Sequence, residues 1–314
     1  MIRILVRTFL ILIMISPSYN LFSQEQTLPL YDKQKLAIAD DWLVKKVNSV
    51  SAVYTDKYGN LVLSNGLVSR TFTLHPNTAT VELDNLSTGE SFIRAIKPEA
   101  EVQINGNKFS VGGLSGQKIM NYILPEWYSS LKSDPASFQM TSYEVNPVSE
   151  RFPWKKRKEW ISDDVSWPAH GLHLVFIYKA SDELINKLHR KSIKENKSDY
   201  LKNVTIKVHY ELYDGLPVFC KWITVENRSD EQIMINTFRS EILACIEPES
   251  AADNMISWKL PNITIETDYR FGGMCSDNVM GTSVNWSIDS AYITQVNYEL
   301  KTPCLLEVYP KIGL

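Results

Sequence analysis

The residues of this chain best suited to chemistry are flat aromatic rings and polar side chains in irregular stretches of the sequence. They are Trp127, Trp167, His170, Tyr269, Arg270 and Trp286. A flat ring covers the apolar face of a pyranose, and a guanidinium bridges two neighbouring hydroxyl groups. The alternative is structural, with the tryptophans closing the edge of a sheet and Arg270 paired with Asp268. The six residues predict a carbohydrate-binding surface.

Motifs for other chemistry do not occur in the sequence. There is no GxSxG elbow, HExxH pair, P-loop or glycine-rich dinucleotide turn, and carboxylates such as Glu241 stand alone. The four cysteines, Cys220, Cys245, Cys275 and Cys304, lack the spacing of a zinc site. We therefore predict no metal and no cofactor. We expect each cysteine to be a buried thiol, although an exported protein could also form disulfides.

The elements that must position these residues are strands. From Val204 to Tyr213 apolar and polar residues alternate, which makes one face of a strand apolar. Asp214-Gly215 suits a tight hairpin turn, and a second strand is expected from Val218 to Val225. A third run begins at Ile233 after a polar turn. The pattern predicts a large antiparallel sheet.

Strand and turn signals continue through most of the chain. Further strands are expected at 61–63, 67–74, 78–83, 101–104, 108–111, 172–178, 256–267, 292–300 and 304–309, with Asn105-Gly106 as a type I′ turn. Residues 112–168 are irregular, and a long loop inside a domain is usually functional or covers a sheet edge. Residues 181–199 predict one short helical insertion at the surface. The fold class is all-β, a large antiparallel β-supersandwich over residues 53–314, preceded by an approach segment at 25–52.

Residues 1–24 have the features of a signal peptide. Arg3 and Arg7 precede an apolar stretch from Phe9 to Ile15 that is too short to cross a bilayer, for which about 20 residues are needed. No later stretch is long and apolar enough to be a membrane span. The formal net charge of −3 gives no electrostatic basis for binding nucleic acid. We expect a periplasmic or secreted protein.

Two groups of segments resemble known carbohydrate-related proteins. Asn60 to Phe72 (NLVLSNGLVSRTF) and Leu83 to Glu90 (LDNLSTGE) resemble the opening strands of galactose-mutarotase-like sandwiches. Tyr210 to Val218 (YELYDGLPV) and Thr224 to Glu231 (TVENRSDE) are similar to their central strands. The longer resemblance, over about residues 40–314, is to the N-terminal β-supersandwich of exported proteins like the α-galactosidases of glycoside hydrolase family 36. Its further segments are LPEW at 124–127, DVSWP at 164–168, DYRFGGM at 268–274 and TQVNY at 294–298.

The resemblance implies an accessory carbohydrate-associated domain without independent catalysis. In such enzymes the two catalytic aspartates lie on a (β/α)8 barrel after the sandwich, and these 314 residues contain no alternating strand and helix pattern for a barrel. The expected partners are a carbohydrate, such as a galactoside, and a following or separate catalytic barrel.

Two other functions stay open. The chain could be a stand-alone carbohydrate-binding or scaffolding module. It could also be an aldose 1-epimerase-like enzyme, which needs a histidine acid and a glutamate base on either side of the sugar. The mutarotase Asn-His pair has no counterpart at Ile235 to Glu241, which leaves His170, His173 and Glu307 as candidates.

Overall fold

The structure is a computed structural model that describes residues 28–118, 122–162, 165–191, 200–246, 262–267, 283–289, 291 and 304–310. The expected signal peptide at 1–24 lies outside the described residues, as do Tyr269, Arg270 and Cys275. Among the described residues, no helix is long and apolar enough to cross a membrane.

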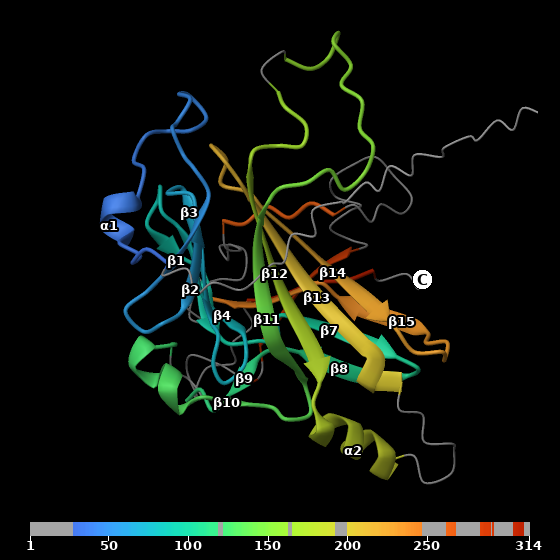
Figure 1. The fold of residues 1–314 in the computed structure, drawn as a ribbon. Helices are drawn as coiled ribbons and strands as arrows, with labels where there is room; N and C mark the ends of the chain where they lie inside the picture. Colours follow the sequence, from blue (N-terminus) through green and yellow to red (C-terminus); the bar gives the residue numbers. More distant parts are fainter. Residues whose placement is uncertain are drawn as a thin grey trace, which may run out of the picture.

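The described strands form four sheets, and the prediction of an all-β sandwich is confirmed (Figure 1). The five-stranded sheet has the order β1 (Ala52–Thr55), β2 (Leu61–Ser64), β3 (Val68–Thr73), β4 (Ala79–Asn85), β5 (Glu90–Ser91). The seven-stranded sheet has the order β14 (Phe219–Asn227), β13 (Val204–Tyr213), β12 (Gly171–Ala180), β11 (Phe138–Pro147), β8 (Asn107–Val111), β7 (Ala100–Ile104), β15 (Ile235–Arg239). The four-stranded sheet has the order β17 (Val284–Ser287), β18 (Leu305–Val308), β16 (Glu241–Cys245), β6 (Ile93–Ala95), and β10 (Lys132–Ser133) pairs with β9 (Leu114–Ser115).

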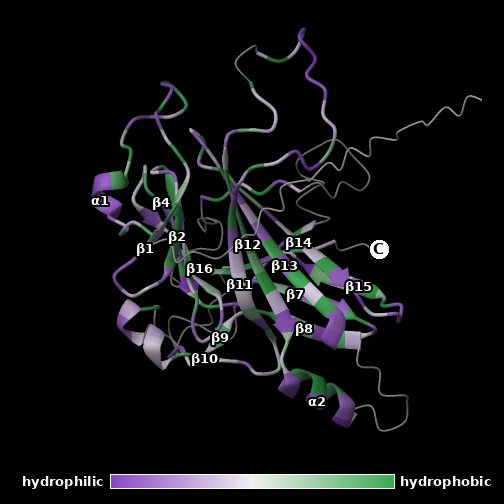
Figure 2. Cartoon of the chain, viewed as in Figure 1, coloured by the Kyte–Doolittle hydropathy of each residue, from purple (hydrophilic) through white to green (hydrophobic). Residues whose placement is uncertain are grey.

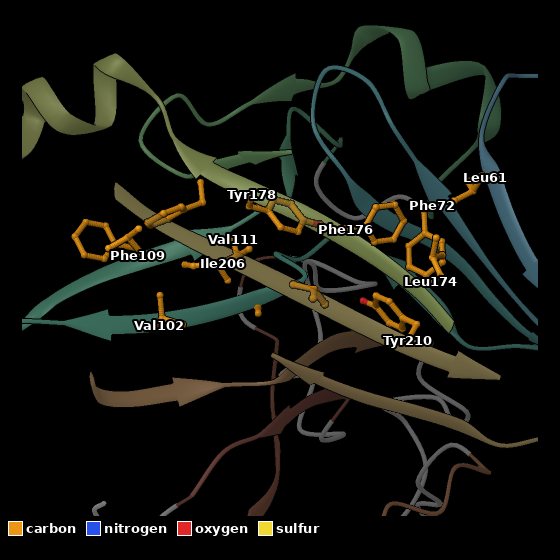
Figure 3. Packing of buried hydrophobic residues seen from close by; sticks show 14 of the residues in the cluster. Leu61, Phe72, Val102, Phe109, Val111, Leu174, Phe176, Tyr178, Ile206 and Tyr210 are labelled. Atoms are coloured by element: carbon orange, nitrogen blue, oxygen red, sulfur yellow. The ribbon is translucent and has the colours of Figure 1, made fainter. Parts of the chain in front are cut away.

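The main core lies between the five-stranded and seven-stranded sheets. Phe72 of β3 packs against Phe176 of β12 and Tyr210 of β13, with ring centroids 5.0 and 4.9 Å apart (Figure 3). Along β13 the residues Val204, Ile206, Val208, Tyr210 and Leu212 are all buried, and the residues between them carry the polar side chains. Figure 2 shows the resulting alternation of hydrophilic and hydrophobic residues along the strands of this sheet. Period-two patterning thus places one face of β13 in the core.

Both predicted hairpin turns are present, but one of the two connections is longer than predicted. Asn105 and Gly106 have φ angles of 49° and 77°, as a type I′ turn requires, and they join β7 to β8. Asp214 and Gly215 form a turn, with a φ of 75° at Gly215, but this turn is part of a longer connection from residue 214 to residue 218. The Asp214 carboxylate accepts a hydrogen bond from the backbone N–H of Ser51 at 2.7 Å, so this corner is shaped by docking against the approach segment.

The expectation that residues 112–168 are irregular was wrong for η1 (Pro125–Ser130), the short strands β9 and β10, and a long strand, β11. Residues 138–147 form β11, which pairs along its length with β12. A β-bulge between Met140 and Ser142 shifts the register of this pairing. A bulge inserts one residue and exchanges the two faces of a strand, so the period-two signal changes phase inside β11. The segment therefore did not look like a strand in the sequence.

Short helices complete the structure. They are α1 (Lys33–Leu36), α2 (Asp182–Lys191) and two 3-10 turns, η1 (Pro125–Ser130) and η2 (Tyr200–Asn203). The predicted helical insertion is α2, whose Leu184 and Ile185 join the main core. The strand expected at 256–267 is not confirmed, because 262–267 contains no strand and 256–261 lies outside the described residues, as does 292–300.

Candidate functional site

The connection between β11 and β12 carries a group of partly exposed aromatic rings around a predicted site residue, Trp167. We call residues 148–162 and 165–170 the aromatic loop; it extends beyond one end of the seven-stranded sheet (Figure 1). The Trp167 ring lies 5.0 Å from Phe152 and 5.5 Å from Trp154, centroid to centroid. Trp167 Nε1 donates a hydrogen bond to Glu150 Oε1 at 3.3 Å. Trp167 is thus the centre of a three-ring cluster with a carboxylate beside it.

Arg151 fastens the aromatic loop to the sheet. Its guanidinium carbon lies 4.2 Å from the ring centroid of Trp222 in β14, which is a cation–π contact. One guanidinium nitrogen lies 3.6 Å from Glu211 Oε2 and 3.5 Å from Cys220 Sγ. These contacts attach the beginning of the aromatic loop to β13 and β14.

A stack of rings lies below Arg151 on the face of the seven-stranded sheet away from the main core. The His209 and Trp222 rings are parallel within 5° and 4.7 Å apart, and His173 stacks 5.2 Å from His209. A nitrogen of His173 hydrogen-bonds Nδ1 of His209 at 3.1 Å, and Nε2 of His209 hydrogen-bonds the Thr224 hydroxyl at 3.0 Å. Burial, with the nearby His173 and Lys207, lowers the pKa of His209 to about 4. His209 is therefore neutral at pH 7, and Trp222 is engaged by both His209 and Arg151.

Glu211 is a buried carboxylate beside this stack. It is 1% exposed, and its Oε2 accepts a hydrogen bond from the Tyr213 hydroxyl at 2.7 Å. Burial and this bond raise the pKa of Tyr213. Glu211 Oε1 has no hydrogen-bond partner among the described residues. Because Arg151 Nη2 lies 3.6 Å from Glu211 Oε2, Glu211 is a contact between the sheet and the aromatic loop.

A second polar group lies inside the sandwich, where four charged side chains from different elements meet. Arg70 of β3 lies 2.6 Å from Glu241 of β16 and 3.6 Å from Glu99. Lys221 of β14 donates to Glu241 Oε1 and to the backbone carbonyl of Glu99, both at 2.6 Å, and Tyr210 donates to Glu99. The charges of the two cations and the two anions sum to zero, and buried charges need such pairing to offset their loss of hydration.

We call Arg70, Glu99, Lys221 and Glu241 the internal ion network. It determines the ionisation state of Glu241, which looks like an isolated carboxylate in the sequence. Burial alone would raise the pKa of Glu241, but the charges of Arg70 and Lys221 outweigh burial and lower it to about 2. Burial lowers the pKa of Lys221, and Glu241 opposes that change. Glu241 is therefore ionised and fully paired, an arrangement suited to joining sheets and unsuited to proton transfer.

The structure brings together only some of the residues predicted to bind carbohydrate. Trp167 and His170 both belong to the aromatic loop, and the His170 side chain is exposed. Trp127 lies in η1, where the Lys118 ammonium is 4.4 Å from its ring centroid, and Trp286 of β17 packs against the small core of Leu243 and Leu306. Among the described residues no hydrogen bond or ring contact joins Trp127 or Trp286 to the aromatic loop.

The pair needed for epimerase chemistry is not assembled in the described part of the chain. Glu307 lies in β18 of the four-stranded sheet, where Arg239 Nε is 2.7 Å from its Oε1 and Asn285 donates to it at 3.4 Å. His170 precedes β12 of the seven-stranded sheet. His173 interacts with His209 and Trp222. Neither histidine contacts Glu307.

Sequence reasoning missed Arg151, His209, Glu211 and Trp222. The signal that could have found three of them is alternation: His209 and Glu211 occupy the polar positions of β13, and Trp222 lies opposite His209 in β14. No local pattern indicates Arg151, which reaches the cluster from a loop. No group of three or more His, Cys, Asp or Glu side chains among the described residues is placed to hold a metal ion.

The chain was compared with models of known protein families and with curated proteins, and it matches none of them.

Proposed function

We propose that this chain is a carbohydrate-associated domain that contacts saccharide through the aromatic loop. In this proposal it is the accessory N-terminal sandwich of an exported protein resembling the family 36 α-galactosidases, and it acts in the periplasm or outside the cell. The fold class is the one that the resemblance implies. The observation that carries the proposal is the three-ring cluster around Trp167, partly exposed and held beside a carboxylate.

The chemistry of the aromatic loop suits a sugar. Phe152 is 48% exposed and Trp160 is 79% exposed, so part of each side chain is available to the C–H groups of a pyranose. The guanidinium carbon of Arg157 lies 5.3 Å from the Trp160 ring centroid. Glu150 is an acceptor for a hydroxyl group, and the exposed His170 side chain is a donor or acceptor at the base of the loop. Arg151 fixes this base to the sheet, which reduces the ordering that binding requires.

The proposal assigns no acid–base step to the domain. Glu241 and Glu307 each have an arginine partner, and Glu211 lies beside Arg151. Burial would raise the pKa of Glu241, but Arg70 and Lys221 lower it to about 2, so this carboxylate is a poor general base at neutral pH.

The test is a titration of the purified chain with a panel of galactosides, followed by intrinsic tryptophan fluorescence and calorimetry. We expect millimolar binding that Phe152→Ala and Trp160→Ala each weaken by about 2- to 10-fold, the range expected for loss of one ring contact. Trp127→Ala is the matched control, because Trp127 lies in η1, and it should leave the affinity unchanged. Absence of binding across the panel, or an equal loss in the control, would refute the proposal.

A further inference from the structure

Two cysteines that are far apart in the sequence lie opposite each other on neighbouring strands. β16 and β18 are antiparallel, and Ala244 pairs with Leu305. The next position in this register places Cys245 opposite Cys304, and the backbone N–H of Cys245 donates to the carbonyl of Cys304 at 2.8 Å. Directly opposite residues of an antiparallel pair point to the same face of the sheet. The two thiols therefore face each other from adjacent strands.

The spacing of such a pair is close to that of a disulfide. Opposite residues of a hydrogen-bonded pair, such as Cys245 and Cys304, have Cα atoms about 5.5 Å apart, which is inside the range found for disulfides. The Cβ atoms of such a pair are about 5.5 Å apart, and a disulfide needs roughly 3.5 to 4.5 Å. The strands must approach slightly for the bond to form. A bond formed with such strain is more easily reduced than a relaxed one.

The surroundings bury both thiols beside each other and restrict the access of other reagents. Cys245 and Cys304 are 0% and 3% exposed, and Cys245 packs with Leu243, Val284 and Leu306. Burial, and then the neighbouring Cys304, raises the pKa of Cys245, so its thiolate is scarce and its oxidation slow. Cys220 lies in β14 of another sheet, beside Arg151. It is not placed to compete for either thiol.

We propose that Cys245 and Cys304 are a redox-sensitive pair that closes to a cross-strand disulfide when a small-molecule disulfide is supplied. One protein thiolate attacks a sulfur of the oxidant, forming a mixed disulfide and releasing one small thiol. The second protein thiolate attacks the protein sulfur of the mixed disulfide, which forms the Cys245–Cys304 bond and releases the second small thiol. The two protein thiols are oxidised, the oxidant is reduced, and its two thiols carry the two protons.

The bond would connect the sandwich to its last strands. β18 lies between β16 and β17 in the four-stranded sheet. The bond would fix β16 to the start of β18 and close the chain between residues 245 and 304. Closing a loop lowers the entropy of the unfolded chain, so the oxidised protein should be the more stable form. This inference does not depend on the proposed function.

The test is disulfide mapping of the full chain. The reduced protein is exposed, without denaturant, to oxidised glutathione; free thiols are then alkylated, and the unreduced digest is analysed by mass spectrometry. We expect the main cross-linked peptide to contain Cys245 and Cys304 and to disappear on reduction. Cys220→Ser and Cys275→Ser should retain it, and Cys304→Ser should lack it. The thermal midpoint of the wild type should rise on oxidation, and the midpoint of Cys245→Ala should not.

Two results would overturn the proposal. One is a main cross-link that joins Cys245 or Cys304 to Cys220 or Cys275. The other is four alkylated cysteines in the folded protein after an exposure that oxidises the urea-unfolded chain, because this shows that the oxidant is competent and the folded pair does not close. The mapping uses the wild type, so it decides the matter even if a cysteine variant fails to fold.

Discussion

Replacing Lys221 by Met tests whether the internal ion network is a fixed part of the sandwich. The Lys221 side chain is 8% exposed, and its ammonium donates to Glu241 and to the backbone carbonyl of Glu99. Without it, Glu241 and Glu99 share only Arg70, which leaves one uncompensated negative charge in the interior. Met has a similar volume and no charge, so the change in packing should be small.

The magnitude follows from the cost of breaking a buried ion pair. Removal of one partner costs about 3 to 5 kcal/mol, because the remaining charge stays desolvated. For a domain of this size class about 1 kcal/mol lowers the thermal midpoint by roughly 2 to 4 °C. We therefore expect a fall of roughly 6 to 20 °C at pH 7. The double variant Lys221→Met with Glu241→Gln restores a neutral interior and should be more stable than Lys221→Met alone.

The assay is thermal unfolding followed by tryptophan fluorescence, with Lys207→Met as the control. Lys207 lies in β13 and pairs with Glu226 at 2.5 Å, but the two side chains are 28% and 33% exposed. Such a surface pair contributes about 0 to 1 kcal/mol. Equal stability of the Lys221→Met and Lys207→Met variants would refute the account of the network, and so would a double variant less stable than Lys221→Met.

Three further predictions concern the face of the sheet that carries the aromatic loop. Because the fold favours neutral His209, with a pKa of about 4 against an ordinary 6.5, its contribution to stability is complete above about pH 6.5 and is lost as the pH falls towards 4. Between pH 7 and pH 4.5 the free energy of unfolding measured in urea should fall by about 2 kcal/mol, allowing for partial solvent screening. This fall should be smaller in His209→Gln, and an unchanged pH dependence in that variant would contradict the reasoning. Arg151→Ala should free the aromatic loop and speed trypsin cleavage at residues 155–158, as followed by electrophoresis, and cleavage at the wild-type rate would show that Arg151 does not hold the loop. Gly171→Ala should destabilise the protein by about 3 kcal/mol in thermal unfolding, because the new Cβ would lie 2.3 Å from the Leu212 carbonyl oxygen. A loss of stability below about 1 kcal/mol would show that the backbone adjusts freely.

The sequence by itself determined the fold class and most of the strands. The alternation from Val204 to Tyr213 is β13 with its predicted bounds, and Asn105-Gly106 forms the predicted turn. These features depend on neighbours in the chain, since period-two burial and positive φ angles are local properties. The pattern failed where the bulge in β11 changed its phase.

The contacts that define the candidate sites were decided by the tertiary structure alone. Arg70 and Glu241 are 171 residues apart, and Arg151 and Cys220 are 69 residues apart, yet each pair is in contact. Trp167 and Trp127 looked equivalent in the sequence, but one is the centre of the aromatic loop and the other lies in η1. Periodicity shows which face of a strand is buried, but only strand order and register show which distant side chains share that face.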